Sequence, residues 1–496
     1  MKKGSITVFL SLLLGIVLSL VCTSIYSAKI AASRTMTVSA MDQSLYSVFA
    51  EYDTDVLENY GLFFLDGGYG KSQFQPGSLY KRAKSYAAAV LEPGKNSILA
   101  GNSLLNIQIK NGGISGYALA SDGNGRLLKS QAIAYMQDTL LEQGVQSLLS
   151  KLQNQQQQEA GNNQSGNVQA GEQAITDYDA VKQQAEEEQE RKKQETDSSQ
   201  GEEQEVNTTE VPLDFVNPIE VIKQIKKLGI LGVVVPGGVV SSKSVEVTSL
   251  PSHRSLAQGM GEYSLDMDID SVTSNLMFQE YLLDMCGNYT GTPAGGLDYQ
   301  IEYILQGKGS DKENLEGVVK QLLLIREASN LAYLYQDGAK REAVNTMAQI
   351  ICAAIGLPVV APAVQLALLA CWAYGESILD VRELLDGGKI PLIKSTQSWQ
   401  LSLENLASIA EHLDQDRKST ENGMNYSEYL RLLLAKENKT EIAQRTMDIV
   451  ENTIRVKYAR PEFSIDACLV YAEVFLNVQA ESKRNYEIVR GYGYDM

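Results

Sequence analysis

Three aspartates with alternate spacing are the first candidates for chemistry. Asp266, Asp268 and Asp270 follow the pattern that begins an EF-hand calcium loop, in which carboxylate oxygens bind the cation. The twelfth position of that loop needs a bidentate glutamate and is Met277 here, and the sixth position, which needs glycine, is Ser271. We therefore interpret the aspartates as one solvent-exposed face of a strand and predict no metal site.

A second group of acidic residues could supply the paired carboxylates that glycoside-type hydrolysis requires. Two of them follow arginines, as Arg326-Glu327 and Arg382-Glu383, on either side of a long uncharged stretch. Charge on exposed helix faces explains the group as well, and we expect the two Arg-Glu pairs to be buried ion partners of the uncharged stretch. The full group is Glu302, Glu327, Glu376, Asp380 and Glu383.

Ser252-His253 places a possible nucleophile beside a possible base. Adjacent residues do not form a catalytic triad by themselves, and the sequence has no Gly-x-Ser-x-Gly elbow. We predict a capping or hydrogen-bonding role for this pair. The chain also has no Walker A loop, dinucleotide fingerprint or Cys-x-x-Cys motif. We therefore predict no catalytic residue and no cofactor.

Length and charge limit the classes of protein that these residues can serve. The chain has 496 residues, with 43 Lys and Arg against 61 Asp and Glu, which gives a formal net charge of −18. That length is enough for two or three domains with real cores. Binding to nucleic acid requires a basic surface that neutralises phosphates, so the acidic composition argues against a nucleic-acid partner.

The first segment predicts a membrane anchor. Residues 1–4 include Lys2 and Lys3, and no charged residue follows from Ser5 to Ala28. This run gives roughly 36 Å of helix against roughly 30 Å of hydrocarbon, whereas a secretory signal has an apolar core of only about 7–15 residues. We predict a retained span over 5–28 with a cytoplasmic leader, 1–4, because positive charge favours the cytoplasmic side. A cleaved signal sequence is the alternative.

The helical pattern continues past the predicted span. Met41, Leu45, Val48 and further apolar residues up to Tyr60 recur at spacings of three and four, which is one face of a helix. Gly61 stands where a helix-ending glycine is expected. We predict one helix from 5 to 60, with its second half packed against a folded domain. Two helices with a bend near Ala28 are the alternative.

Composition divides the rest of the chain. Residues 61–152 predict a small α+β domain, in which Asn111-Gly112-Gly113 would be a hairpin turn and Asp122-Gly123-Asn124-Gly125 a second turn. Residues 153–210 are rich in Gln and Glu with few aromatic residues, and predict a disordered acidic linker with at most a transient helix around 180–193. Residues 211–496 predict a larger, mainly helical domain.

Two features of that larger domain are specific. Residues 343–375 are uncharged and broken by Gly356-Leu357-Pro358, which predicts a buried helical hairpin, with membrane insertion as the alternative. Period-two alternation over 464–494 predicts a C-terminal β-hairpin. The cysteines outside the anchor are expected to be buried free thiols, although the helical hairpin could bring two of them together, Cys352 and Cys371. The other two are Cys286 and Cys468.

The N-terminus resembles pilin-like proteins of tight-adherence (Tad/Flp-type) pilus systems. The resemblance rests on residues 3–8, Lys-Gly-Ser-Ile-Thr-Val, directly before the apolar run. It implies cleavage by a prepilin peptidase between Gly4 and Ser5. The glutamate that such proteins carry five residues past the cut is replaced by Phe9.

Further segments are similar to an uncharacterised family of membrane-anchored proteins from Gram-positive bacteria. This resemblance implies a location near Tad-type pilus genes and brings no catalytic residue with it. It covers nearly the whole chain except the acidic linker. The segments are residues 4–10, 49–53, 303–308, 324–328, 372–377, 380–382 and 391–394.

Together these observations predict a helix-rich α+β protein with a long N-terminal transmembrane helix and a large extracytoplasmic part. We expect a non-enzymatic structural or assembly component of a Tad/Flp-type pilus or secretion apparatus, anchored in the cell membrane and bound to other proteins of the assembly. The alternatives are an anchored extracytoplasmic hydrolase that uses carboxylates, and a surface adhesin or sensor.

Overall fold

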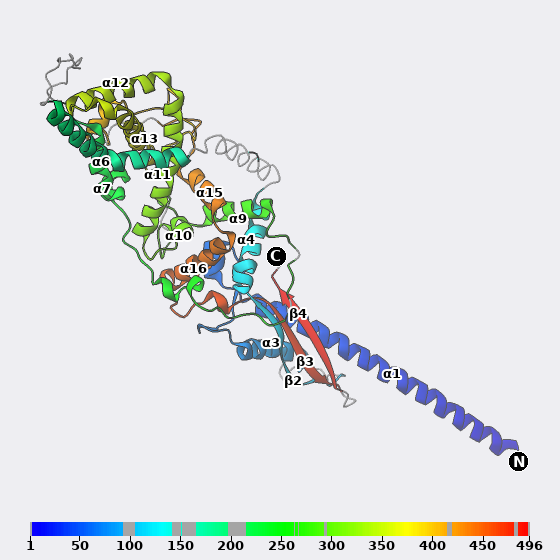
Figure 1. Ribbon diagram of the computed structural model, residues 1–496. Coiled ribbons are helices and arrows are strands. Elements are labelled where there is room, and N and C mark those ends of the chain that lie inside the picture. Colours follow the sequence, from blue (N-terminus) through cyan, green and yellow to red (C-terminus); the bar gives the residue numbers. More distant parts are fainter. Residues whose placement is uncertain are drawn as a thin grey trace. The chain divides into compact units, whose positions relative to one another are not determined.

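The structure is a computed structural model that describes residues 2–92, 105–140, 150, 165–196, 215–261, 263–265, 267–291, 295–413, 419–480 and 485–494. It is helix-rich with one small antiparallel sheet, as predicted (Figure 1). The chain folds into two compact units. Unit 1 combines Met1–Thr139, Thr248–Tyr281 and Lys439–Met496, and unit 2 combines Leu140–Val247 and Leu282–Asn438.

The first helix, α1, runs unbroken from Lys2 to Phe49, so the predicted continuity through Ala28 is confirmed and no bend is present. The predicted extension to Tyr60 is wrong. The Asp53 carboxylate accepts a hydrogen bond from the Val56 backbone N–H at 3.1 Å and starts a separate helix, α2 (Thr54–Tyr60). Aspartate competes with a continuing helix because it satisfies the free N–H groups of a new one. Gly61 ends α2 at a φ of 63°, as predicted.

The sheet of unit 1 is built around β3. Its partners are β2 on one edge and β4 on the other, and the two-residue β1 pairs with its first residues, all antiparallel. Ala472, Val474, Leu476 and Val478 face α1 and α3 in the core, which confirms the predicted alternation and the β3–β4 hairpin. The bounds are β1 (Leu65–Asp66), β2 (Gln108–Leu119), β3 (Cys468–Gln479), β4 (Asn485–Gly493) and α3 (Pro76–Leu91).

The predicted turn at Asn111-Gly112-Gly113 lies inside β2, which is a single strand. The two glycines are needed for packing, because a Cβ on Gly113 would lie 2.9 Å from the Phe475 ring across the sheet. The turn at Asp122–Gly125 is present, with Gly123, Asn124 and Gly125 all at positive φ. These residues stand at the start of α4 (Asp122–Thr139), whose helical conformation follows Gly125.

The predicted boundary at residue 211 differs from the structure, because β3 and β4 pair with β2 and belong to unit 1. A strand edge needs a hydrogen-bonding partner, and this one comes from a part of the chain more than 300 residues away. The remaining elements of unit 1 are η2 (Val247–Ser249), η3 (Pro251–His253), α16 (Lys439–Lys457) and η6 (Ile465–Ala467), and α9 (Val272–Met285) begins in it.

Unit 2 is a set of helices around α13 (Ala361–Leu385), which is buried over nearly its whole length. The predicted helical hairpin is present, with α12 (Gly338–Ala354) and α13 in contact across the proline-containing η4 (Pro358–Val360). The other elements are α7 (Pro218–Lys227), α8 (Ile230–Val234), η1 (Pro236–Gly238), α10 (Gln300–Gln306), α11 (Asp311–Gln336), η5 (Glu404–Ser408), α14 (Ile409–His412) and α15 (Tyr426–Lys436).

The predicted disordered linker contains a helix, α6 (Ser165–Thr196), which is a correction to the sequence-based expectation. Its buried residues form one face that packs on α13. An amphipathic face of this kind offsets the entropy of ordering even in an acidic segment. Residues 151–164 and 197–214 lie outside the described residues. The face consists of Val168, Gly171, Ile175, Tyr178 and Ala185.

Candidate functional site

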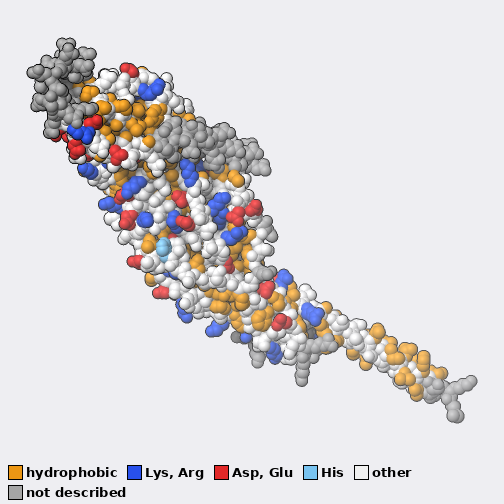
Figure 2. Space-filling model, in the orientation of Figure 1, with side chains coloured by type: hydrophobic (Ala, Val, Ile, Leu, Met, Phe, Trp, Pro, Cys, Tyr) orange, Lys and Arg blue, Asp and Glu red, His pale blue; other side chains and the backbone are white. Residues whose placement is uncertain are grey.

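The first candidate site is the exposed part of α1. Apolar side chains from Ile6 to Tyr26 are 41–68% exposed, and Figure 2 shows hydrophobic side chains covering this part of the helix. Two helical segments in the described residues are long and apolar enough to cross a membrane, Ile6–Phe49 and Pro358–Leu385. The second is mostly buried inside unit 2. The N-terminal helix is therefore the candidate single membrane span.

The second half of α1 is fixed in unit 1 by polar contacts as well as by its buried apolar face. Ser44 donates to the Ala83 carbonyl at 2.6 Å, and the Thr37 and Tyr486 hydroxyls are 3.1 Å apart. Asp42 pairs with Arg490 at 2.5 Å. A single helix thus passes from an exposed apolar surface into a packed core.

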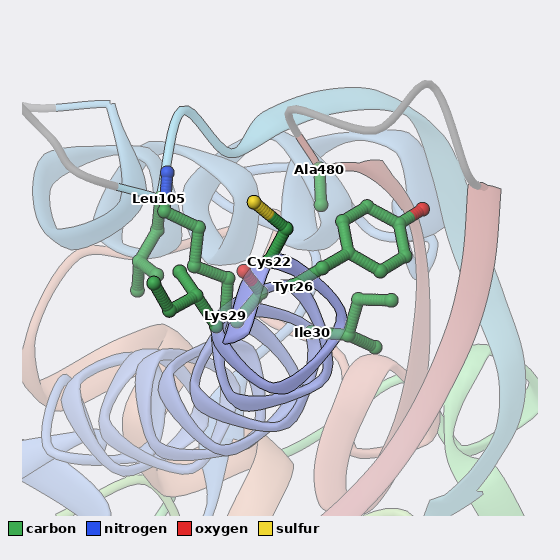
Figure 3. Close-up of a pocket in the computed structure, with 8 residues that line it drawn as sticks. Cys22, Tyr26, Lys29, Ile30, Leu105 and Ala480 are labelled. Atoms are coloured by element: carbon green, nitrogen blue, oxygen red, sulfur yellow. The ribbon is translucent and has the colours of Figure 1, made fainter. Parts of the chain in front are cut away.

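A pocket of about 330 Å³ lies where the exposed part of α1 meets the folded unit. Cys22, Tyr26 and Lys29 reach into it from α1, with Leu105 and Ala480 opposite (Figure 3). The described residues that line it are mainly apolar and include no carboxylate. These residue types suit contact with apolar groups and offer no acid–base pair for catalysis. Gly4 and Ser5, the predicted processing site, lie in the first turns of α1, and their cleavage stays a prediction.

The second candidate site is a buried cluster of four charges in unit 2. The Lys394 ammonium lies 2.6 Å from both Glu376 Oε1 and Asp380 Oδ1, and Arg326 binds Asp380 Oδ2 at 3.0 Å. All four side chains are fully buried. Two basic and two acidic side chains thus meet, and burial raises the pKa of Glu376 although Lys394 counteracts this effect. We call these four residues the buried charge cluster.

Neighbouring polar groups complete the cluster. Arg326 also donates to the Tyr429 hydroxyl at 3.0 Å and to the Pro391 carbonyl at 2.9 Å, and the Leu401 N–H donates to Glu376 at 2.7 Å. Burial alone would raise the pKa of Asp380, but Lys394 and Arg326 outweigh it and the pKa is lowered. Asp380 Oδ1 makes only the ion contact with Lys394, whereas the hydrogen bonds to the other groups reduce the desolvation cost of the buried ion network.

Arg326 and Glu327 are both buried, and Arg326 forms its ion pair with Asp380 on α13, the helix that carries the second half of the uncharged stretch. Adjacent residues on a helix point in different directions, so Glu327 faces Lys226 and Glu172 instead. Arg382 and Glu383 are both buried, as expected, and Arg382 donates to the Val233 carbonyl at 2.8 Å.

The sequence did contain a signal for part of the cluster. Glu376 and Asp380 are four residues apart, which places them on one face of a helix. Lys394 follows α13 in an irregular segment, and no local pattern marks it as their partner.

A family of unknown function, DUF5702, matches residues 207–480, which is more than half of the chain. The chain belongs to this family. No curated protein and no solved structure matches the chain. The DUF5702 region includes the buried charge cluster and β3, whereas α1, β2 and β4 lie outside it.

Within the DUF5702 region, Ser252, His253 and Asp448 meet in unit 1. The Ser252 hydroxyl donates to Asp448 Oδ2 at 2.5 Å and lies 2.8 Å from His253 Nδ1. In a catalytic triad the acid orients the histidine, whereas here Asp448 binds the serine. This arrangement fits the predicted hydrogen-bonding role, since the Ser252 N–H also donates to Asp448.

The remaining sequence candidates serve as surface charge or as core residues. Asp270 pairs with Arg126 and Lys129 at 3.4 Å, and Asp266 lies outside the described residues. No group of three or more possible metal ligands gathers among the residues that the structure describes. Cys352 and Cys371 are free thiols and form no disulfide with each other. The other cysteines are free thiols as well.

Glu302 is a further buried carboxyl of the DUF5702 region. Its Oε1 accepts hydrogen bonds from the Tyr289 N–H at 2.9 Å and the Tyr426 hydroxyl at 2.7 Å, whereas Oε2 has no hydrogen-bond partner among the described residues. Burial, with a smaller effect from Asp311, raises its pKa to about 7. Glu302 is therefore neutral in the folded protein at mildly acidic pH.

This raised pKa predicts that unit 2 loses stability as the pH rises. Below about pH 4.5 the carboxyl is protonated in both the folded and unfolded states, and ionisation then favours the unfolded chain until about pH 7. The contribution of Glu302 to the free energy of unfolding should fall by about 3 kcal/mol over that interval. Urea unfolding of the wild type and of Glu302→Gln at both ends of the interval measures the difference. Equal losses in the two proteins would contradict the assignment.

Proposed function

We propose that this protein is a non-enzymatic, single-pass membrane protein and a structural or assembly component of a Tad/Flp-type pilus or secretion apparatus. The observation that carries the proposal is α1, one helix whose first part exposes apolar side chains and whose second part is built into unit 1. Lys2 and Lys3 before the span favour a cytoplasmic N-terminus, so that both folded units lie outside the cytoplasm.

The use of the carboxylates supports a non-enzymatic role. Glu376 and Asp380 are neutralised by Lys394 and Arg326 and are fully buried. A hydrolytic pair needs access to substrate and to water. Neither of these carboxylates, nor Glu302, lines the pockets at α1 or the pocket of about 420 Å³ beside Asp122.

The N-terminal resemblance supports the pilus part of the proposal. Residues 3–8 precede the apolar run as in Tad/Flp-type pilin-like proteins, and the resemblance to membrane-anchored proteins of Gram-positive bacteria implies a location near Tad-type pilus genes. In this proposal, the exposed face of α1 packs laterally against helices of the same assembly in the membrane. Small residues on that face, such as Gly15 and Ser19, allow close approach of a neighbouring helix.

Mass spectrometry of the native membrane protein tests the proposal. We expect the protein to remain in the membrane after an alkaline carbonate wash, with a mature chain that starts at Ser5. Gly4→Leu should block this processing, whereas Gly15→Leu, the same change at a site with no neighbouring atom within 4 Å, should leave it intact. A chain cleaved after Ser27 would show a removed signal sequence and overturn the proposal, and an intact Met1 would remove its prepilin part.

A further inference from the structure

Helix α6 packs on α13 and α11 of the same unit through one face. Gly171 packs so closely that a Cβ there would lie 2.7 Å from the Ala370 side chain on α13. Val168, Ile175 and Tyr178 complete the contact, and the Tyr178 hydroxyl accepts a hydrogen bond from Asn217 at 2.9 Å. Beyond Ala185 the described side chains of α6 are exposed. This apolar face packs on α13 and α11, and charged side chains stand beside it.

Charged side chains from α6, α7 and α11 lie close together where α6 packs on the rest of unit 2. The Lys226 ammonium on α7 pairs with Glu172 on α6 and lies 4.1 Å from the centre of the Tyr374 ring. Glu327 on α11 is 2% exposed and faces the same lysine, and its Oε1 has no hydrogen-bond partner among the described residues. The half-exposed Glu172 and the buried Glu327 thus both lie near one ammonium group.

Every helix around Glu327 contributes to its electrostatic environment. Burial is the main cause that raises its pKa, to about 8, and Lys226 lowers it while Glu172 raises it through like charge and a shared hydrogen bond. On the α13 side stand neutral Cys371 and Tyr374, whose own pKa values are raised mainly by burial. Lys223, also on α7, is engaged with Asp179 at 2.5 Å and Glu220 at 3.6 Å.

We propose that α6 is a proton-controlled strap, which docks on α11 and α13 while Glu327 is protonated and detaches when Glu327 ionises beside Glu172. The raised pKa of Glu327 determines whether docking is favoured at low or at high pH. The protonated carboxyl supports docking at low pH, and this support is lost as the pH rises from about 4.5 to about 8. Detachment exposes the apolar face of α13 around Ala370 that α6 covers.

Tryptic cleavage of the full-length protein in detergent tests this strap. Lys182 lies on α6, and trypsin cuts it only when the helix is released and unfolds. Between about pH 6 and about pH 9, the rate of cleavage at Lys182 should increase in the wild type by a factor at least tenfold larger than in Glu327→Gln. One pKa unit corresponds to about a factor of ten in the equilibrium between docked and released α6. Comparing the two proteins at each pH cancels the pH dependence of trypsin itself.

Two further variants make the result decisive. Glu316→Gln changes a carboxylate at the surface of α11, the helix that carries Glu327. Glu316 pairs with Lys320 at 2.7 Å, and the variant should behave as the wild type. Glu172→Gln removes the facing charge from α6 and should also suppress the pH dependence, which covers the case in which Glu327→Gln does not fold. The proposal would be overturned if the cleavage rate did not increase with pH in the wild type. It would also be overturned if the increase were the same in the wild type, Glu327→Gln and Glu172→Gln.

Discussion

Replacing Asp380 by alanine is expected to destabilise unit 2 by about 3–5 kcal/mol. Asp380 is the one carboxylate that contacts both cations of the buried charge cluster, Lys394 at 2.6 Å and Arg326 at 3.0 Å. Its removal leaves two positive charges in a site with no exposed surface and only Glu376 to balance them. A buried unpaired charge costs more than the lost pair contributes, because its hydration is not restored.

Tryptophan fluorescence measures this effect in unit 2 alone. The chain has two tryptophans, Trp372 and Trp399, and both lie in unit 2 with ring centres 5.5 Å apart. Urea unfolding followed at these residues should show the loss for Asp380→Ala. Glu316→Ala is the matched control, because it breaks an exposed pair on α11 that is worth about 0.5 kcal/mol or less. A loss for Asp380→Ala no greater than for the control would show that the cluster is not a stabilising network.

Leucine-to-alanine changes at two positions of α1 should have opposite outcomes. Leu45 is 1% exposed in the core of unit 1, and Leu45→Ala should cost about 2–5 kcal/mol through lost burial and the cavity left behind. Leu14 is 66% exposed in the candidate span, so Leu14→Ala should leave the stability of unit 1 unchanged within about 0.5 kcal/mol.

Hydrogen exchange of the β3 amides in detergent-solubilised protein measures both variants. The core face of β3 packs against α1, so the opening of unit 1 exposes these amides to exchange. We expect faster exchange only for Leu45→Ala. Equal effects from Leu45→Ala and Leu14→Ala would mean that the two halves of α1 do not differ in packing as the structure has them.

The sequence predicted the elements whose pattern is local. The apolar stripe of α1, the glycine that ends α2 and the alternation of β3 are each written in neighbouring residues, and each is present. Reasoning from neighbouring residues alone also gave the wrong prediction of a turn at Gly112-Gly113. A glycine pair is typical of a turn, but here it makes room for Phe475, a residue far away in the chain.

Other features depend on distant contacts that a single sequence does not reveal. The acidic composition of 153–210 hid the face of α6, although Val168, Ile175 and Tyr178 do recur at helical spacing. The buried charge cluster takes its residues from α11, α13 and the segment after α13. The types of its residues were visible in the sequence, whereas their pairing follows from tertiary packing.

If α1 spans a membrane as proposed, its unbroken course fixes which way unit 1 faces relative to the span as well as how far unit 1 stands from the bilayer. A helix turns by about 100° and rises by about 1.5 Å per residue. One extra residue between Ala28 and Ser33 would therefore rotate the sheet of unit 1 by more than a quarter turn while hardly changing its height. The number of residues between the span and the core thus sets the direction in which unit 1 faces relative to the span. A neighbouring protein that binds both the span and unit 1 fits only one such direction, and therefore only one number of residues.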